Sequence, residues 1–331
     1  MILHNDKSAF QTIIDKIATA NKIRRDVLEK DYYVTLILEE LSRKENQNYT
    51  YFKGGTALYK CLHSIKRFSE DIDLTVNIDN CKSNNQKKQR LKEATLRYTS
   101  LNLNECSKIV NRNSIEVEYL YKSIFTIDIN DSLQRFGKVK IEATSFTVSE
   151  PTNTIKIAPH LYELSNDADK KTLEDFFDVK PFNIETITLE RIFVDKVFAA
   201  EFYYERHQYD DVAKHIYDIT TLMKNDRIIA FLNNKEKFQQ IVQYKRKEEL
   251  DRKGGVDASL NMNNFKYFNS LKNESAFIDV FNKMQNIYVF NEADKIQIDD
   301  VNNTLYKLQK MLEYWNKNLW ILSQKSLEIY K

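Results

Sequence analysis

Glycine and proline are scarce in this chain, and their positions divide it into two parts. Only five glycines and three prolines occur among 331 residues, and all three prolines fall between residues 151 and 181. Before this window, several short runs alternate apolar and polar residues, which is typical of β-strands with one buried face. After it, apolar residues recur every three or four positions, which is typical of helices. The pattern predicts a sheet in the N-terminal part and a helical C-terminal part.

The domain organisation follows from these patterns. The predicted strands cover residues 50–53, 70–76, 115–121, 124–129 and 139–146. We expect N-terminal helices that brace the sheet over residues 1–46 and a core that contains the sheet over residues 47–150. A linker region with the prolines should follow over residues 151–185, and a helical domain over residues 186–331.

The composition is that of a folded protein and excludes several classes. Hydrophobic residues make up 42% of the chain and charged residues 30%, far from the composition of disordered chains. The formal net charge is only +2, so a polyanionic partner would have to be bound by local patches. Cys61, Cys81 and Cys106 lack the spacing of a zinc site and favour a reducing compartment. Since no apolar run is long enough to span a membrane, we expect a cytoplasmic protein without a membrane partner.

Two of the five glycines, Gly54 and Gly55, are adjacent and lie between the predicted strand 50–53 and a predicted helix. Such a turn exposes backbone N–H groups at the positive end of a helix, where they can bind phosphate. The Thr56 hydroxyl can donate a further hydrogen bond. For the glycine pair taken alone, a tight turn that needs a positive φ is the simpler interpretation.

The segment that follows carries two carboxylates. On an extended strand, Asp71 and Asp73 point to one face while Ile72 and Leu74 point to the other. Two like charges so placed repel each other unless a cation lies between them, and Mg²⁺ typically binds through one or two carboxylates plus substrate phosphates. The sequence therefore indicates a metal site, although an exposed edge strand would also explain Asp-x-Asp by itself.

Together these segments resemble a known family. Lys53-Gly54-Gly55-Thr56 and Arg67-Phe68-Ser69-Glu70-Asp71-Ile72-Asp73-Leu74 resemble the signature of the AbiEii/AbiGii abortive-infection toxins, and residues 29–35 resemble a further family segment. The resemblance implies a polymerase-β-like fold, an α/β (α+β) nucleotidyltransferase core with a mixed sheet, plus a helical C-terminal domain. It also implies that Gly54, Gly55 and Thr56 bind the triphosphate of an NTP, and that Asp71 and Asp73 bind Mg²⁺ or Mn²⁺.

Folds of this kind need a third carboxylate on a neighbouring strand. Glu142 is our choice, because it lies in a cleanly alternating run and resembles the acidic strand position of the family. Asp128 lies in an equally clean alternation and is the alternative. A solvated strand face would explain either residue without chemistry.

Further resemblance lies on the predicted C-terminal helices. Asp195-Lys196 is similar to the family's Glu-Lys element, and Lys214-His215-Ile216-Tyr217-Asp218 is similar to its Arg-His-x-Tyr-Asp element. The resemblance implies that Lys196 holds the phosphates of the nucleotide and that Asp218 orients the nucleotide. It also implies that Lys214 and His215 help to bind the nucleotide. Lysine in place of arginine puts bidentate phosphate contact by Lys214 in question.

The expected function is metal-dependent nucleotidyl transfer. The resemblance implies a bacterial toxin of a toxin–antitoxin or phage-defence system, with a cognate antitoxin encoded nearby. Such a toxin transfers a nucleotide from an NTP to RNA, and we expect tRNA as the acceptor. A nucleotidyltransferase that modifies a small molecule or a protein side chain is one alternative. A catalytically silent nucleotide-binding module is another.

A basic run could contact RNA. Between Lys82 and Arg97 there are six basic residues and one acid, which gives a local charge of +5. A solvated helix face explains the same run.

Overall fold

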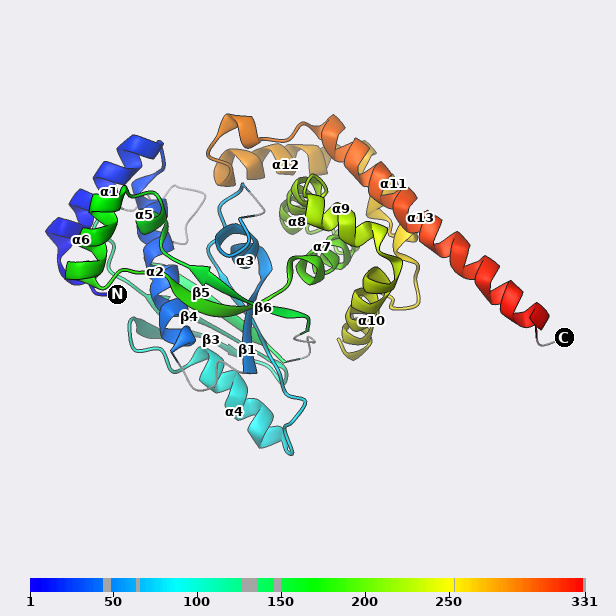
Figure 1. Ribbon diagram of the computed structural model, residues 1–331, viewed down its shortest axis with the longest axis horizontal. Helices are drawn as coiled ribbons and strands as arrows, with labels where there is room; N and C mark the ends of the chain where they lie inside the picture. Colours follow the sequence, from blue (N-terminus) through cyan, green and yellow to red (C-terminus); the bar gives the residue numbers. More distant parts are fainter. Residues whose placement is uncertain (44–48, 64–65, 127–135, 146–149, 253, 330–331) are drawn as a thin grey trace. The chain divides into compact units, whose positions relative to one another are not determined.

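The computed structural model describes residues 1–43, 49–63, 66–126, 136–145, 150–252 and 254–329, with side chains as far as Tyr314. The chain divides into two compact units (Figure 1). The first comprises Met1–His63 and Phe68–Thr188, and the second comprises Ser64–Arg67 and Leu189–Lys331. Each unit is described by itself.

The first unit is built on a mixed sheet. Its described strands are β1 (Thr50–Lys53), β2 (Ile72–Val76), β3 (Asn102–Val110), β4 (Ser114–Leu120), β5 (Lys138–Thr144), β6 (Thr152–Ile157) and β7 (Phe182–Ile187). They lie in the order β3-β4-β5-β2-β1-β7-β6. The pairs β2–β5 and β1–β7 are parallel and the other neighbours are antiparallel.

Helices of the first unit pack on this sheet and on one another. They are η1 (Leu3–Asn5), α1 (Lys7–Asn21), α2 (Arg25–Ser42), α3 (Gly54–Lys60), α4 (Asn84–Thr95), α5 (His160–Glu163) and α6 (Asp167–Phe177). On β4, Tyr119 is buried and its hydroxyl donates to the Thr95 carbonyl at the end of α4. Tyr121, two residues later, stacks on Tyr33 of α2 with ring centroids 4.1 Å apart. Side chains alternate along β4 and β5, so their polar residues face away from α2 and α4.

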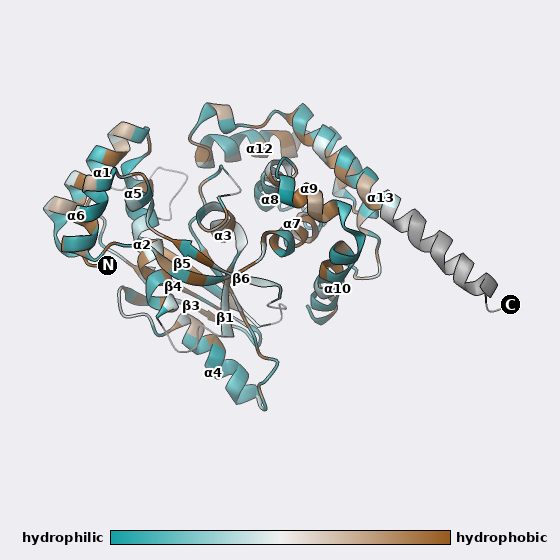
Figure 2. Ribbon diagram, viewed as in Figure 1, coloured by the Kyte–Doolittle hydropathy of each residue, from teal (hydrophilic) through white to brown (hydrophobic). Residues whose placement is uncertain are grey.

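The second unit is helical. Its elements are α7 (Leu189–Tyr204), α8 (Tyr209–Leu222), α9 (Asp226–Asn233), α10 (Lys235–Asp251), η3 (Met262–Asn264), α11 (Tyr267–Ser270), η4 (Leu271–Asn273), α12 (Ser275–Tyr288), η5 (Glu292–Asp294) and α13 (Ile298–Ile329). Helix α8 packs against α7, α12 and α13. Figure 2 shows hydrophobic residues along α7 and α9, whereas α4 of the first unit is hydrophilic over most of its length. Among the described helices, none has the length and apolarity needed to cross a membrane.

The predicted fold class is confirmed, because a mixed α/β unit is followed by a helical region. The expected strands 50–53, 70–76, 115–121 and 139–146 correspond to β1, β2, β4 and β5. The expected strand 124–129 is wrong in its described part, residues 124–126, which has no regular structure. Strand β3 was missed because its polar, mostly exposed residues do not alternate.

The expected linker over residues 151–185 is wrong. This stretch contributes β6, α5, α6 and most of β7 to the first unit. Pro151 directly precedes β6, Pro159 is the N-cap residue of α5, and Pro181 directly precedes β7. Proline is well tolerated at the start of an element, so these residues mark element boundaries here and not a linker.

The buried face of β5 should carry much of the stability of the first unit. Ile141 is fully buried, and we expect Ile141→Ala to lower the free energy of unfolding by about 2–5 kcal/mol because it removes apolar contacts and leaves a cavity. Ile109 on β3 is 53% exposed and offers a matched control, since Ile109→Ala should change stability by about 0.5 kcal/mol or less. Urea unfolding of both variants checks this, and equal losses would contradict the assigned burial.

Candidate functional site

Acidic side chains lie side by side on the polar face of the sheet. In the parallel register of β2 and β5, Asp73 lies directly opposite Glu142, and in the antiparallel register of β4 and β5, Glu142 lies opposite Glu116. Cross-strand partners share a face and have Cβ atoms about 5 Å apart. The structure thus places Glu142 next to one of the two predicted metal ligands. Asp128, the alternative, lies outside the described residues.

Lys140 joins this acidic group. Its ammonium lies 3.0 Å from a Glu116 carboxylate oxygen. Burial is the largest single effect on Lys140 and lowers its pKa, but the hydrogen bond with Glu116 and the charges of the nearby carboxylates together raise the pKa above its ordinary value of 10.5. The charges of Asp71 and Glu142 contribute to the same rise, which indicates that both carboxylates lie near this ammonium.

The donor set fits a hard cation, although no cluster is preformed. In the part of the chain that the structure describes, the Glu142 side chain makes no hydrogen bond or ion pair, so its carboxylate oxygens are available as ligands. No group of three or more metal-ligating side chains is close enough to hold an ion among the described residues. Carboxylate oxygens are the ligands that Mg²⁺ and Mn²⁺ prefer.

Gly54 brings backbone against Asp73. Its φ is +80°, which confirms that the glycine pair forms a turn needing a positive φ. A Cβ atom at this position would lie only 2.0 Å from Asp73 Oδ2. The turn at the start of α3 and the carboxylate on β2 are therefore in direct contact, an arrangement that glycine permits and a larger residue would not.

Thr56 and Lys53 are held by neighbouring side chains. The Thr56 hydroxyl is buried and donates to Ser69 Oγ at 3.0 Å. Lys53 Nζ donates to Thr144 Oγ1 at 3.2 Å, and Lys53 is the register partner of Asp73. These contacts fix the turn relative to β2 and β5, whereas phosphate binding by Thr56 stays a prediction.

In the helical unit, Asp218 is the centre of a buried ion-pair group. Arg67 donates to both of its carboxylate oxygens, from Nε at 2.7 Å and from Nη2 at 2.8 Å. Lys196 Nζ lies 2.9 Å from Oδ2. The Asp218 side chain is fully buried and those of Arg67 and Lys196 are 5% and 8% exposed. Two cations against one carboxylate leave this group with a net charge of +1.

The ion pairs set the protonation of Asp218 and His215. Burial alone would raise the pKa of Asp218, but Arg67 and Lys196 lower it to about 2. Burial and the nearby charge of Lys196 lower the pKa of His215 well below 6.5, so its imidazole is neutral at physiological pH. Its ring stacks on Tyr203 at a centroid distance of 5.3 Å, and its buried Nδ1 has no partner among the described residues.

Lys214 lies at the edge of this group. Its ammonium is 3.4 Å from a carboxylate oxygen of Asp211 and lies 5.7 Å from the centre of the Tyr288 ring. It is partly exposed, with 23% of its side chain accessible.

The predicted site residues thus form two groups, one in each unit. Gly54, Gly55, Thr56, Asp71, Asp73 and Glu142 lie in the first unit, and Lys196, Lys214, His215 and Asp218 lie in the second. Sequence reasoning assigned no role to Arg67, Ser69, Glu116 and Lys140. Arg67 and Ser69 lie within the motif that carries the family resemblance, so that motif could have indicated them. Glu116 and Lys140 come next to the site through the strand register, which no local pattern encodes.

A comparison with protein families supports this reading of the motifs. A family model described as nucleotidyl transferase AbiEii toxin, type IV TA system, matches residues 36–305. The match includes every predicted site residue of both groups. None of the curated proteins searched matches the chain.

The contact between Gly54 and Asp73 can be tested by adding one methyl group. We expect Gly54→Ala to destabilise the protein by roughly 2 kcal/mol more than Gly254→Ala. Both glycines have a positive φ, +80° and +71°, so both variants carry the backbone strain of a left-handed alanine.

The control differs in what the new Cβ would meet. At Gly254 it would lie 3.5 Å from the end of the Arg206 side chain, which is an ordinary contact. Denaturant unfolding measures both losses, and equal values would show that Asp73 does not approach the turn as described.

Asp218 should make stability depend on pH in the acid range. Because the pKa of Asp218 is about 2 in the folded state and its ordinary value is 3.8, the folded protein binds fewer protons than the unfolded protein in the acid range. The stability that Asp218 contributes is therefore complete above pH ~4. It falls by about 2 kcal/mol as the pH drops through 2. We expect Asp218→Asn to lose about 3–5 kcal/mol at pH 7, with a smaller deficit near pH 2.

Asp211→Asn, on the same helix but 43% exposed, is the control and should change stability by about 0.5 kcal/mol or less. Urea unfolding between pH 2 and pH 7 gives the values. A deficit of Asp218→Asn that stayed constant over this range would contradict the lowered pKa.

Proposed function

The chain belongs to the AbiEii family of nucleotidyl transferase toxins of type IV toxin–antitoxin systems, and we propose that it transfers a nucleotide from an NTP to RNA, with tRNA as the acceptor. The family makes it a nucleotidyltransferase with a nucleotide substrate and a cognate antitoxin. The dependence on Mg²⁺ or Mn²⁺, the RNA acceptor, the place in phage defence and the cytoplasmic location are our proposals.

One observation carries the proposal at the level of residues. Asp73 and Glu142 are register partners on adjacent parallel strands, and the backbone at Gly54 lies against the Asp73 carboxylate. The glycine turn at the start of α3 and two carboxylates thus lie close together, which supports a site for a triphosphate with a divalent cation.

We assign the metal ligands to Asp71, Asp73 and Glu142. A divalent cation held there would supply positive charge that offsets the charge of the phosphates. Glu142, whose side chain forms no hydrogen bond or ion pair with the other described residues, would accept the proton of the acceptor hydroxyl. The hydroxyl oxygen then forms a bond to the α-phosphorus while the bond to the leaving pyrophosphate breaks.

The turn of the first unit would bind the phosphates of the nucleotide. Backbone N–H groups at Gly54 and Gly55 would donate to the phosphates, with the Thr56 hydroxyl as a further donor once it leaves Ser69. We also keep Lys196, Lys214 and His215 as nucleotide-binding residues, on the strength of the family motif. Asp218 then acts as a positioning residue, since it holds Lys196 at 2.9 Å.

A transfer assay tests the function directly. The pure protein is incubated with Mg²⁺, each labelled NTP in turn, and total RNA, a protein extract or small metabolites as acceptor. We expect label on RNA of tRNA size. Label on protein or on a small molecule instead would overturn the RNA acceptor and retain nucleotidyl transfer, and no label with any acceptor would favour a silent nucleotide-binding module.

The roles of the carboxylates can be separated in the same assay. We expect Asp73→Asn and Glu142→Gln each to lower the transfer rate at least about 100-fold, because each removes a ligand or the base. Glu118→Gln should keep parental activity. Glu118 lies on the same face of the sheet but is paired with Lys138.

Asp128→Asn decides between the two candidates for the third carboxylate. Activity of this variant within about threefold of the parent is expected, with the folded fraction checked by circular dichroism. Loss in Asp128→Asn together with retention in Glu142→Gln would move the role to Asp128.

A further inference from the structure

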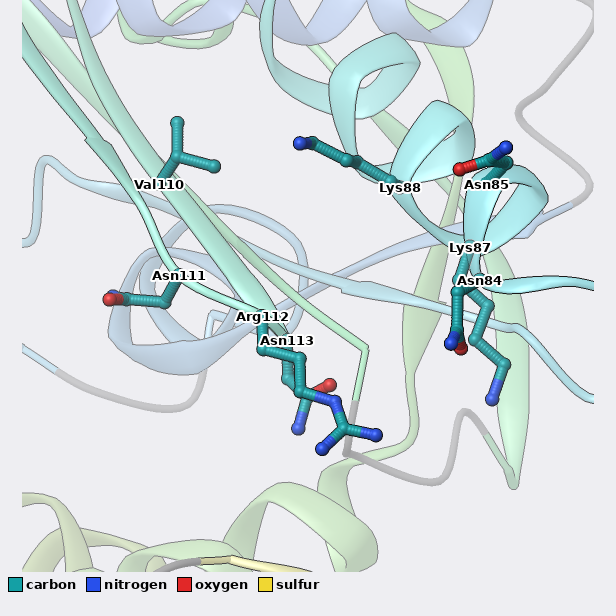
Figure 3. A pocket seen from close by; sticks show the side chains of 8 residues that line it. All are labelled: Asn84, Asn85, Lys87, Lys88, Val110, Asn111, Arg112 and Asn113. Atoms are coloured by element: carbon teal, nitrogen blue, oxygen red, sulfur yellow. The ribbon is translucent and has the colours of Figure 1, made fainter.

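A basic cavity lies in the first unit, between α4 and the turn that joins β3 to β4 (Figure 3). Its volume is about 420 Å³. Three cationic side chains line it, Lys87 and Lys88 from α4 and Arg112 from the turn, together with asparagines at both walls. None of the described residues that line this α4 cavity is acidic.

The cationic side chains approach the cavity from both walls. Figure 3 shows Lys88 extending from α4 toward Val110 on the facing strand. Lys87 and Arg112 leave opposite walls and extend to the same side of the cavity. Positive charge is therefore gathered around one space and not spread along a helix.

In the described part of the chain, these three charged side chains contribute no ion pair to the fold. Within the described ranges, Lys87, Lys88 and Arg112 form no ion pair with a carboxylate. Other members of the basic run are engaged, because Arg90 donates to the Asn77 carbonyl and lies over the Tyr49 ring, and Arg97 lies 3.4 Å from Glu93. Like charges around one cavity repel each other, so the arrangement favours an anionic occupant.

The chemistry of the lining favours nucleic acid over protein. Lysine, arginine and asparagine side chains are the usual donors to phosphate oxygens, and an amide can also bond a ribose 2′-hydroxyl. A protein interface would need buried aromatic or large apolar anchors, and Val110 is the apolar residue that this cavity offers.

We propose that the α4 cavity binds the phosphodiester backbone of the acceptor RNA. This rests on the proposed function, in which the acceptor is RNA. Helix α4 packs against β2 and β5, the strands that carry Asp73 and Glu142. A backbone held at α4 is therefore held in the same compact unit as the carboxylates, although α4 covers the opposite face of the sheet.

The test compares two variants with the same loss of charge. The cavity variant carries Lys87→Gln, Lys88→Gln and Arg112→Gln. The control variant carries Lys82→Gln, Lys92→Gln and Arg97→Gln, which lie in or beside α4 but do not line the cavity. Binding of purified bulk tRNA is measured by fluorescence anisotropy without NTP over a range of KCl concentrations, and melting temperatures verify that both variants fold.

We expect the cavity variant to bind tRNA at least tenfold more weakly than the control variant, and the slope of log affinity against log salt to flatten by up to about 3 units. In the transfer assay, its KM for tRNA should rise while kcat and the affinity for Mg²⁺–NTP stay within about twofold of the parent. Equal losses in both variants, or none in the cavity variant, would overturn the proposal.

Binding and transfer are measured separately, so the two proposals can fail separately. A parent that labels tRNA while the cavity variant binds tRNA normally would refute the cavity proposal alone. A parent that binds tRNA through the cavity but labels no RNA would refute the proposed acceptor and support the cavity as an RNA site. A parent without affinity for tRNA at any salt concentration would overturn the cavity proposal.

Discussion

The parallel pairing of β2 with β5 is the constraint on which the candidate site depends. It places Asp73 opposite Glu142, although 69 positions separate them in the chain. A slip of one residue in this register would turn Glu142 toward the apolar face, where Ile141 and Ala143 are fully buried. The cost of burying a charge there holds the register, so the packing of the sheet and the position of the carboxylates have the same physical cause.

Lysine side chains partly offset the negative charge of the carboxylates within the first unit. Lys140 pairs with Glu116, and Lys53 is the register partner of Asp73. Carboxylates this close would destabilise the sheet by repulsion if no cation were near. The neighbouring lysines allow the fold to form with the acids in place, while the Glu142 side chain forms no ion pair of its own in the described structure.

In the helical unit, a buried carboxylate is paired directly with two cations. Asp218 binds both Arg67 and Lys196 with nearly complete burial, so each cation depends on the same carboxylate. Removing one member of a buried ion pair is costly because the other charge stays out of water. Arg67 reaches this group from a short segment, Ser64–Arg67, whose flanking residues belong to the first unit, and it lies only four positions before Asp71 in the chain.

The sequence by itself determined the local features: the strands β1, β2, β4 and β5, the glycine turn and the helical second half. Each depends on neighbouring residues, through alternation, helical spacing or the need for a positive φ. Tertiary structure decided which distant residues meet. It put Glu142 beside Asp73 and made Arg67 a partner of Asp218. It also formed two strands and two helices from the segment 151–187, and it brought Arg112 to the same cavity as Lys87 and Lys88. These contacts come from strand register and packing between segments far apart in the chain, which no local pattern encodes.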